Sequence, residues 1–191
     1  MEPRRRPQDG RGEQTCVAGA TEGIGMTRWC GWGVAVSLVL LGSSAQALEP
    51  ARVNLALKRP TTGSAICKPG EEAEKAVNGL LASKTHDKFC SLERPAWLQV
   101  DLQSLRTLHG FTVKHAQAGA EPASMNTRAF ALSVSPDGAR WRQVVKIDDN
   151  VEGVSTHRIA PMQARYVRLE VSQPAQDPAD PATRIYELEV W

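Results

Sequence analysis

Hydrophobic and polar residues alternate in short runs from Trp97 to the end of the chain, which predicts a series of half-buried β-strands. No alternation of strands with helices accompanies these runs, so the pattern predicts an all-β fold, a sandwich or barrel of antiparallel strands. The runs are WLQVDL from Trp97, FALSVS from Phe130, WRQVVKI from Trp141, RYVRLEV from Arg165 and RIYELEV from Arg184.

Turn and helix patterns lie between these runs. SPDG from Ser135 predicts a hairpin turn, because Pro136 presets φ and Gly138 accepts a positive φ. The segment Ser172 to Thr183 contains three prolines and predicts a long surface loop. The convincing helical segment is EEAEKAV, Glu71 to Val77, with Glu71 and Lys75 spaced i, i+4.

Composition bounds the class of protein. A chain of 191 residues with 41% hydrophobic and 23% charged residues is long enough for one domain with a full core. The formal net charge of +2 gives no electrostatic footprint for nucleic acid, so nucleic acid is not an expected partner.

The amino-terminal region has the pattern of a secretory signal peptide from Met26 to Ala47. Arg28 precedes an apolar run from Val34 to Leu41, and Ala45 and Ala47 form an A-x-A cleavage site. We therefore expect an exported, extracellular protein with a mature tail at 48–53, the alternative being an uncleaved segment that stays as an anchor. Residues 1–25 precede the signal, and the simplest hypothesis is that translation starts at Met26 rather than Met1.

The glycine-rich stretch VAGATEGIG, Val17 to Gly25, is similar to a dinucleotide-binding turn. Such a turn functions only between a strand and a helix, because the helix N-terminus holds the pyrophosphate. The polar DGRGEQTC precedes it and the signal peptide follows it, so we reject the nucleotide interpretation.

Two cysteines, Cys67 and Cys90, remain after removal of the leader. In an exported domain the simplest expectation is a disulfide between them. The alternative is a pair of free, buried thiols.

Seven segments in order resemble the discoidin, or coagulation factor 5/8 type C, domain over Asn54 to Trp191. They are NLALKRPTTGSA, AVNGL, KFCS, WLQVDL, SPDGARW, ARYVRLEV and RIYELEVW. The segments HAQAGAE and NTRAF make the sequence most similar to the bacterial members of this family, the family 32 carbohydrate-binding modules. This resemblance implies a β-sandwich jelly roll of about eight antiparallel strands with one short helix, and a ligand site in loops at one end.

The stretch VKHAQAGAEPASMNTRAF supplies the candidate ligand-binding residues His115, Glu121, Asn126 and Arg128. A sugar hydroxyl both donates and accepts hydrogen bonds, and these side chains offer both kinds of partner. The resemblance matches His115, Arg128 and Asn126 to the His, Arg and Asn of galactose-binding members. The structural alternatives are a His bonded to backbone, an Asx turn at Asn126 and an ordinary ion pair at Arg128.

The candidate loops carry no aromatic residue to stack on a sugar ring, which indicates either weak affinity for a sugar or a ligand other than a monosaccharide. Phe89 and Met125 are the candidate apolar residues that could contact the sugar ring in place of a loop aromatic. Trp97, Trp141 and Trp191 fit core or sheet packing better.

The resemblance also implies a structural calcium site. Its expected ligands are Asn78, Ser83 and Glu187, with backbone carbonyls near Ala76 and Tyr186. Calcium needs six to eight oxygen ligands. Asn78 stands where the family pattern has Asp and so removes a charge; the alternative is a turn capped by hydrogen bonds.

The expected function is a secreted, non-catalytic module that binds galactose or N-acetylhexosamine type glycans, including cell-surface or extracellular polysaccharide. No H-E-x-x-H, G-x-S-x-G or P-loop motif supports an enzyme. The alternative is an adhesion module for lipid head groups or protein, for which Leu80, Leu81 and Met125 are the exposed apolar candidates without a polybasic patch.

Overall fold

The structure is a computed structural model that describes residues 52–81 and 87–191. The described residues belong to one compact unit, Leu48–Trp191. The predicted leader, the predicted signal peptide, residues 48–51 of the tail and Ser83 lie outside the described residues. None of the helices in the described ranges is long and apolar enough to cross a membrane.

Antiparallel strands make up most of the described chain, and the helical segments are short 3-10 helices. The strands are β1 (Thr61–Gly63), β2 (Phe89–Ser91), β3 (Ala96–Lys114), β4 (Ala129–Ser135), β5 (Arg142–Ile147), β6 (Val154–Gln173), β7 (Thr183–Ile185) and β8 (Glu187–Val190). The 3-10 helices are η1 (Ala73–Val77), η2 (Ala116–Gly119) and η3 (Ala123–Met125).

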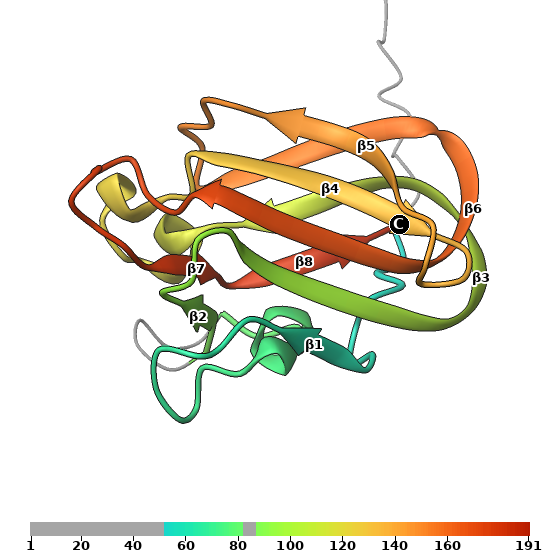
Figure 1. The fold of residues 1–191 in the computed structure, drawn as a ribbon, viewed down its shortest axis with the longest axis horizontal. Coiled ribbons are helices and arrows are strands. Elements are labelled where there is room, and N and C mark those ends of the chain that lie inside the picture. The colour runs from blue at the N-terminus through green and yellow to red at the C-terminus, as the bar shows by residue number, and fades with distance from the viewer. Residues whose placement is uncertain (1–51, 82–86) are drawn as a thin grey trace, which may run out of the picture. The chain divides into compact units, whose positions relative to one another are not determined.

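Two long strands, β3 and β6, build the sandwich. They pair along nearly their whole length, with irregular register between Asp101 and Arg106. The first half of β3 also pairs with β1, and its second half pairs with β8. The second half of β6 pairs with β4, which in turn pairs with β5. These pairings confirm the predicted antiparallel β-sandwich (Figure 1).

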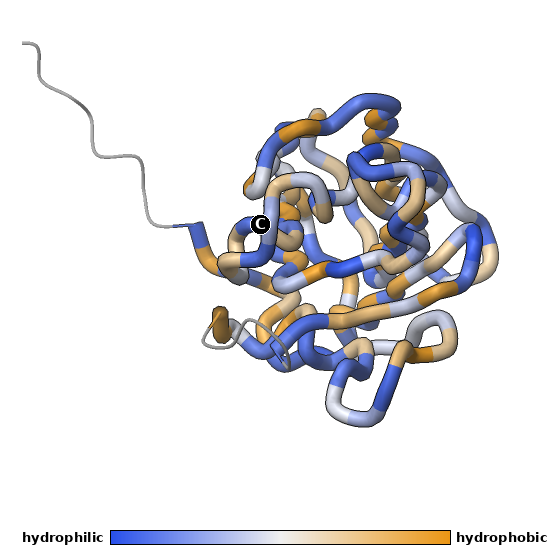
Figure 2. Tube along the Cα trace, turned by 90° about the vertical axis from the view of Figure 1, so that its left-hand side faces the viewer, coloured by the Kyte–Doolittle hydropathy of each residue, from blue (hydrophilic) through white to orange (hydrophobic). Residues whose placement is uncertain are grey.

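The alternating residues of the predicted strands form the core. Leu98, Val100 and Leu102 of β3 are buried, as are Val167 and Leu169 of β6. Figure 2 shows hydrophobic and hydrophilic residues interspersed along the trace. Burial of such apolar side chains is the main favourable contribution to folding, about 1.5 to 3 kcal/mol for each large one.

The predicted hairpin turn lies between β4 and β5. Ser135 Oγ accepts hydrogen bonds from the backbone N–H groups of Asp137 and Gly138 at 3.3 and 2.9 Å. Gly138 has φ of +78°, which a residue with a Cβ adopts at a cost. This turn lies at the end of the sandwich opposite the loops that follow β3 (Figure 1).

Two details differ from the expectations. The predicted helix Glu71 to Val77 is the 3-10 helix η1, which begins at Ala73, and Glu71 pairs with Lys68 and Lys88 rather than Lys75. The predicted closing strand is divided into β7 and β8 at Tyr186, because β7 pairs with β2 whereas β8 pairs with β3.

The predicted disulfide between Cys67 and Cys90 is present, with a Cα–Cα distance of 5.4 Å. It links the segment before η1 to β2. Since β2 pairs with β7, the disulfide fixes a small two-stranded sheet at the end of the sandwich that also carries η2 and η3 (Figure 1).

Candidate functional site

A shallow hollow lies at the loop end of the sandwich and has a volume of about 740 Å³. We call it the end pocket. Its charged lining residues are Lys68, Glu71, Lys88, Glu121 and Arg184. Its apolar lining includes the Cys67–Cys90 disulfide, Leu92, Pro122 and Met125. The pocket therefore combines a charged lining with apolar walls.

Glu121 connects the charged groups of the end pocket. Its Oε1 lies 2.7 Å from Lys88 Nζ, and its Oε2 lies 3.1 Å from Arg184 Nε. Its side chain is only 11% exposed. Two cations therefore hold this carboxylate in one position, as a buried charge requires.

The network continues on both sides of Glu121. Lys88 Nζ also lies 3.4 Å from Glu71 Oε1, and Arg184 Nη1 lies 2.7 Å from Asp180 Oδ2. Donors and acceptors therefore alternate along the pocket floor, and each charge has an opposite neighbour.

Tyr186 is a further hydrogen-bond partner of Glu121. Its hydroxyl donates a hydrogen bond to Glu121 Oε1 at 2.6 Å. Burial, and then this bond, raise the pKa of Tyr186, so its phenol stays protonated and remains a donor. Gly119 makes the contact possible, because a Cβ there would lie 1.9 Å from the tyrosine ring.

Strand register explains how residues far apart in sequence reach the pocket. Cys90 of β2 lies opposite Arg184 of β7, so the disulfide and the guanidinium are neighbours. Lys88 directly precedes β2, and Glu121 follows η2 with its backbone N–H bonded to Ala116 O at 3.1 Å.

The structure does not place the four predicted ligand-binding residues in one site. Glu121 lines the end pocket. His115 and Asn126 are both 0% exposed. Arg128 borders a different hollow.

His115 is buried because Phe111, Val113 and His115 alternate along the end of β3 and all three face the core. Its Nε2 lies 3.1 Å from Ser155 Oγ, and its ring packs against Phe130 with centroids 5.4 Å apart. Burial, and secondarily the neighbouring His157, lower the pKa of His115 to about 4. In this structure the imidazole has no surface for a ligand.

Asn126 holds the loop together instead of facing solvent. Its Oδ1 accepts a hydrogen bond from the backbone of Gln117 at 2.8 Å, and its Nδ2 donates to Gln117 Oε1 and to Val151 O. These bonds link η2, the end of η3 and the segment before β6. Asn126 thus shapes the loop that carries Glu121.

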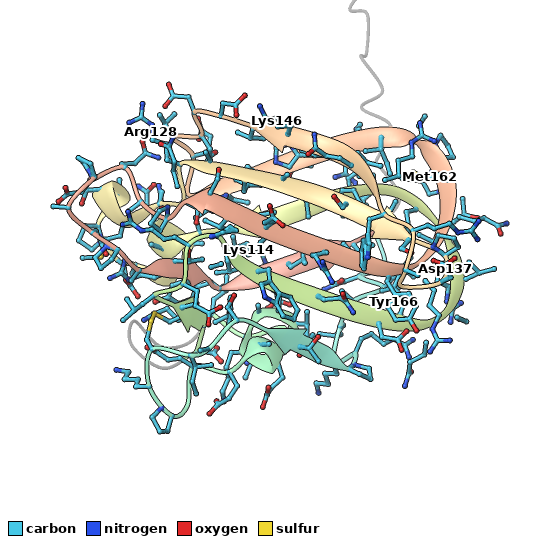
Figure 3. All side chains as sticks on the ribbon, in the orientation of Figure 1. Lys114, Arg128, Asp137, Lys146, Met162 and Tyr166 are labelled. Carbon is cyan, nitrogen blue, oxygen red and sulfur yellow. A yellow bond between two sulfur atoms is a disulfide. The ribbon has the colours of Figure 1, made fainter. Side chains whose placement is uncertain are left out.

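Arg128 lies at the same end of the sandwich (Figure 3) and is 42% exposed. Its Nε donates to Asp149 Oδ1 at 2.9 Å. It borders a second hollow of about 210 Å³ whose lining also includes Arg94 and Asp180. Asp180 of this hollow pairs with Arg184 of the end pocket, so one ion pair links a lining residue of each hollow.

Sequence reasoning missed Glu71, Lys88 and Arg184 as pocket residues. The sequence indicates a buried charge at two of these positions. Lys88 directly precedes the apolar residues Phe89 and Cys90 of β2, and Arg184 lies between two buried residues of β7. A charged residue next to buried strand positions requires a partner. The identity of those partners depends on the pairing of β2 with β7, which the sequence pattern alone does not specify.

Of the predicted calcium residues that the structure describes, Asn78 lies at the end of η1 and Glu187 contacts the residue that follows it, Gly79. Glu187 is 1% exposed, and its two oxygens share the backbone N–H of Gly79 at 3.1 and 3.2 Å. Burial raises the pKa of Glu187 to about 7. Asp87, which was not among the predicted ligands, is 9% exposed, and its Oδ2 has no hydrogen-bond partner within residues 52–81 and 87–191. Two buried carboxylates with so few donors fit a hard divalent cation.

The cluster of Cys67, Glu71 and Cys90 does not form a metal site. Ligand atoms of Cys67, Glu71 and Cys90 lie within 4.8 Å of one another. The two sulfurs form the disulfide, so they are not available as thiolate ligands.

Several solved structures share this fold. The family 32 carbohydrate-binding module from Streptococcus pneumoniae EndoD matches with 25% identity and a TM-score of 0.63, covering 73% of this chain and 99% of that one. Chitosan-binding module 1 from the chitosanase/glucanase of Paenibacillus sp. IK-5 matches with 25% identity and a TM-score of 0.60, covering 73% and 99%. The lectin domain of lectinolysin complexed with Lewis B antigen has 20% identity and a TM-score of 0.61, covering 73% and 96%, and shares the fold.

The antiparallel sandwich with a loop-end pocket defines a binding-domain architecture of the discoidin type. The F5/8 type C domain matches residues 60–188, and the chain belongs to this family. No curated protein matches the sequence.

Proposed function

We propose that this protein is an exported, non-catalytic carbohydrate-binding module that holds galactose or N-acetylhexosamine type glycans in the end pocket. The observation that carries the proposal is the fixed Glu121 carboxylate between Lys88 and Arg184, beside apolar walls. The resemblance to family 32 modules, and the chitosan-binding and lectin domains with the same fold, support the choice of glycan as ligand class.

The chemistry of the pocket suits a sugar. Hydroxyl groups need both donors and acceptors, which the ammonium and guanidinium groups and the carboxylates supply. The C–H face of the ring, or the methyl group of an N-acetyl substituent, suits the wall formed by the disulfide, Leu92 and Met125. These apolar groups take the place of an aromatic platform, so we expect weak affinity for a monosaccharide.

Arg128 has a different role in this proposal from Glu121. Since one ion pair, Asp180 with Arg184, links a lining residue of each hollow, we propose that an oligosaccharide held in the end pocket extends past this pair toward Arg128. His115 and Asn126 act on the ligand only through the loops that they hold. We therefore expect Arg128→Ala to weaken oligosaccharide binding and to leave monosaccharide binding unchanged.

A glycan array followed by titration calorimetry tests the proposal. Glu121→Gln keeps the size of the side chain but removes its charge, and we expect at least a tenfold loss of affinity. Arg140→Ala is the matched control, because Arg140 pairs with Asp137 at the opposite end of the sandwich (Figure 3). Absence of glycan binding, or equal binding by Glu121→Gln and the control, would overturn the proposal.

Lipid binding is the rival outcome. Leu57, Leu80 and Leu81 are 44%, 54% and 40% exposed, whereas Met125 lines the end pocket. Flotation with anionic liposomes decides between glycan binding and lipid binding. Liposome binding that is abolished by Leu81→Asp and unaffected by added sugar would favour the adhesion function.

A further inference from the structure

Two buried carboxylates, those of Asp87 and Glu187, bond to neighbouring residues of the turn that follows η1. Asn78 Nδ2 donates to Asp87 Oδ1 at 2.5 Å, and the backbone N–H of the next residue, Gly79, donates to Glu187. Asp87 and Glu187 therefore approach the same turn from segments that are far apart in sequence.

Asn78 directs its amide nitrogen, not its oxygen, toward Asp87. Its Oδ1 accepts a hydrogen bond from the backbone N–H of Leu80 at 2.8 Å. This orientation is fixed by both bonds, since exchanging the oxygen and nitrogen would set two donors or two acceptors against each other at each contact. The residue expected as a calcium ligand thus behaves as a partner of Asp87.

The two carboxylate oxygens of Asp87 differ in their partners. Its Oδ1 accepts a hydrogen bond from Asn78, whereas its Oδ2 has no hydrogen bond to any described residue, although the residue is 91% buried (9% exposed). An unpartnered buried carboxylate oxygen is costly, and the cost is removed when the oxygen coordinates a cation. The ammonium group that acts electrostatically on Glu187, that of Lys114, is itself paired with Glu189 at 2.6 Å.

We propose that Asp87 is a charged ligand of a calcium ion at this turn, with Glu187, and that Asn78 positions Asp87 instead of supplying the ligand charge. The charge that the family pattern has at position 78 is then carried by Asp87, from a different segment. Calcium favours such hard carboxylate oxygens, and the backbone carbonyls near Ala76 and Tyr186 are the neutral ligands that the resemblance adds.

Titration calorimetry of the full chain with calcium chloride, after treatment with a chelator, tests this assignment. We expect one site in the wild type, at least tenfold weaker affinity in Asp87→Asn, and recovery toward wild type in Asn78→Asp/Asp87→Asn, where the charge returns to position 78. Asp148→Asn is the matched control, because Asp148 pairs with Lys146 on the exposed surface.

Thermal unfolding provides a second readout that does not depend on glycan binding. Calcium raises the unfolding midpoint of the wild type, and the increase becomes small in Asp87→Asn. Without calcium we expect Asp87→Asn to be as stable as wild type or more so, because an unpaired buried charge is removed; a purely structural aspartate would give a loss. Unchanged calcium affinity in Asp87→Asn, or no calcium binding by the wild type at millimolar concentration, would overturn the assignment.

Discussion

The hydroxyl of Tyr186 lies 2.6 Å from Glu121 Oε1, although 65 residues separate the two in sequence. Tyr186 lies at the break between β7 and β8, and Glu121 follows η2. This bond joins the small sheet of β2 and β7 to the loop after β3. The position of the pocket carboxylate thus depends on the point where the last strand changes partner.

Replacing Tyr186 with Phe removes this bond and keeps the ring. Glu121 retains Lys88 and Arg184, so we expect a loss of about 1.5 to 3 kcal/mol in the free energy of unfolding, as for a hydrogen bond to a charged group, and a modest loss of glycan affinity. Urea denaturation and titration calorimetry measure the two effects. A variant with wild-type stability and affinity would show that the two cations alone hold Glu121.

The disulfide stabilises the segment that carries Lys68, Glu71 and Lys88. The two cysteines are 23 residues apart. In the chain-entropy model, closing such a loop contributes roughly 3 kcal/mol. We expect Cys67→Ser/Cys90→Ser to lower the unfolding midpoint by several degrees and to weaken glycan binding, as measured by calorimetry of the oxidised wild type and the variant. Equal midpoints would contradict the prediction.

The fold was largely predictable because its main strands alternate over at least six residues. WLQVDL and RYVRLEV fall within β3 and β6, and the turn residues around Gly138 marked the hairpin. The lengths of β3 and β6 were not predictable, because the irregular pairing between Asp101 and Arg106 interrupts the alternation. The short helices η2 and η3 give no periodic pattern of their own.

The candidate site was predictable only in part, for a physical reason. A polar residue in a loop looks the same in sequence whether it faces a ligand or a buried partner. His115 and Asn126 found partners in Ser155, Gln117 and the backbone of Val151. Those partners come from other segments, so long-range pairing decides the outcome.

Burial of His115 makes stability depend on pH. Its pKa is lowered from 6.5 to about 4, so between these values the unfolded state binds more protons than the folded state. The contribution of the neutral ring is fully present above pH 6.5 and is lost as pH falls toward 4, by up to about 3 kcal/mol.

Comparison with His115→Gln isolates this effect from that of the carboxylates. Glutamine keeps a polar group near Ser155 but does not titrate, so we expect the variant to lose less stability than wild type between pH 7 and pH 4. His157, whose pKa burial also lowers, contributes part of the slope in both proteins. Urea denaturation at several pH values measures the slopes, and parallel curves would show that His115 is already protonated or exposed.

Lys88 joins two buried carboxylates of the end pocket. Its side chain is 6% exposed and lies between Glu71, 3% exposed, and Glu121, 11% exposed. Lys88→Met keeps the apolar stem and leaves both carboxylates without this partner, so we expect a loss of about 3 to 5 kcal/mol. In the double variant Lys88→Met/Glu71→Gln, the Glu71 charge is also removed, and Glu121 keeps its ion pair with Arg184. We therefore expect the double variant to be more stable than Lys88→Met alone. Urea denaturation of wild type, both single variants and the double variant measures the coupling. A double variant no more stable than Lys88→Met would contradict the prediction, because it would show that the unpaired Glu71 charge does not cause the loss of stability.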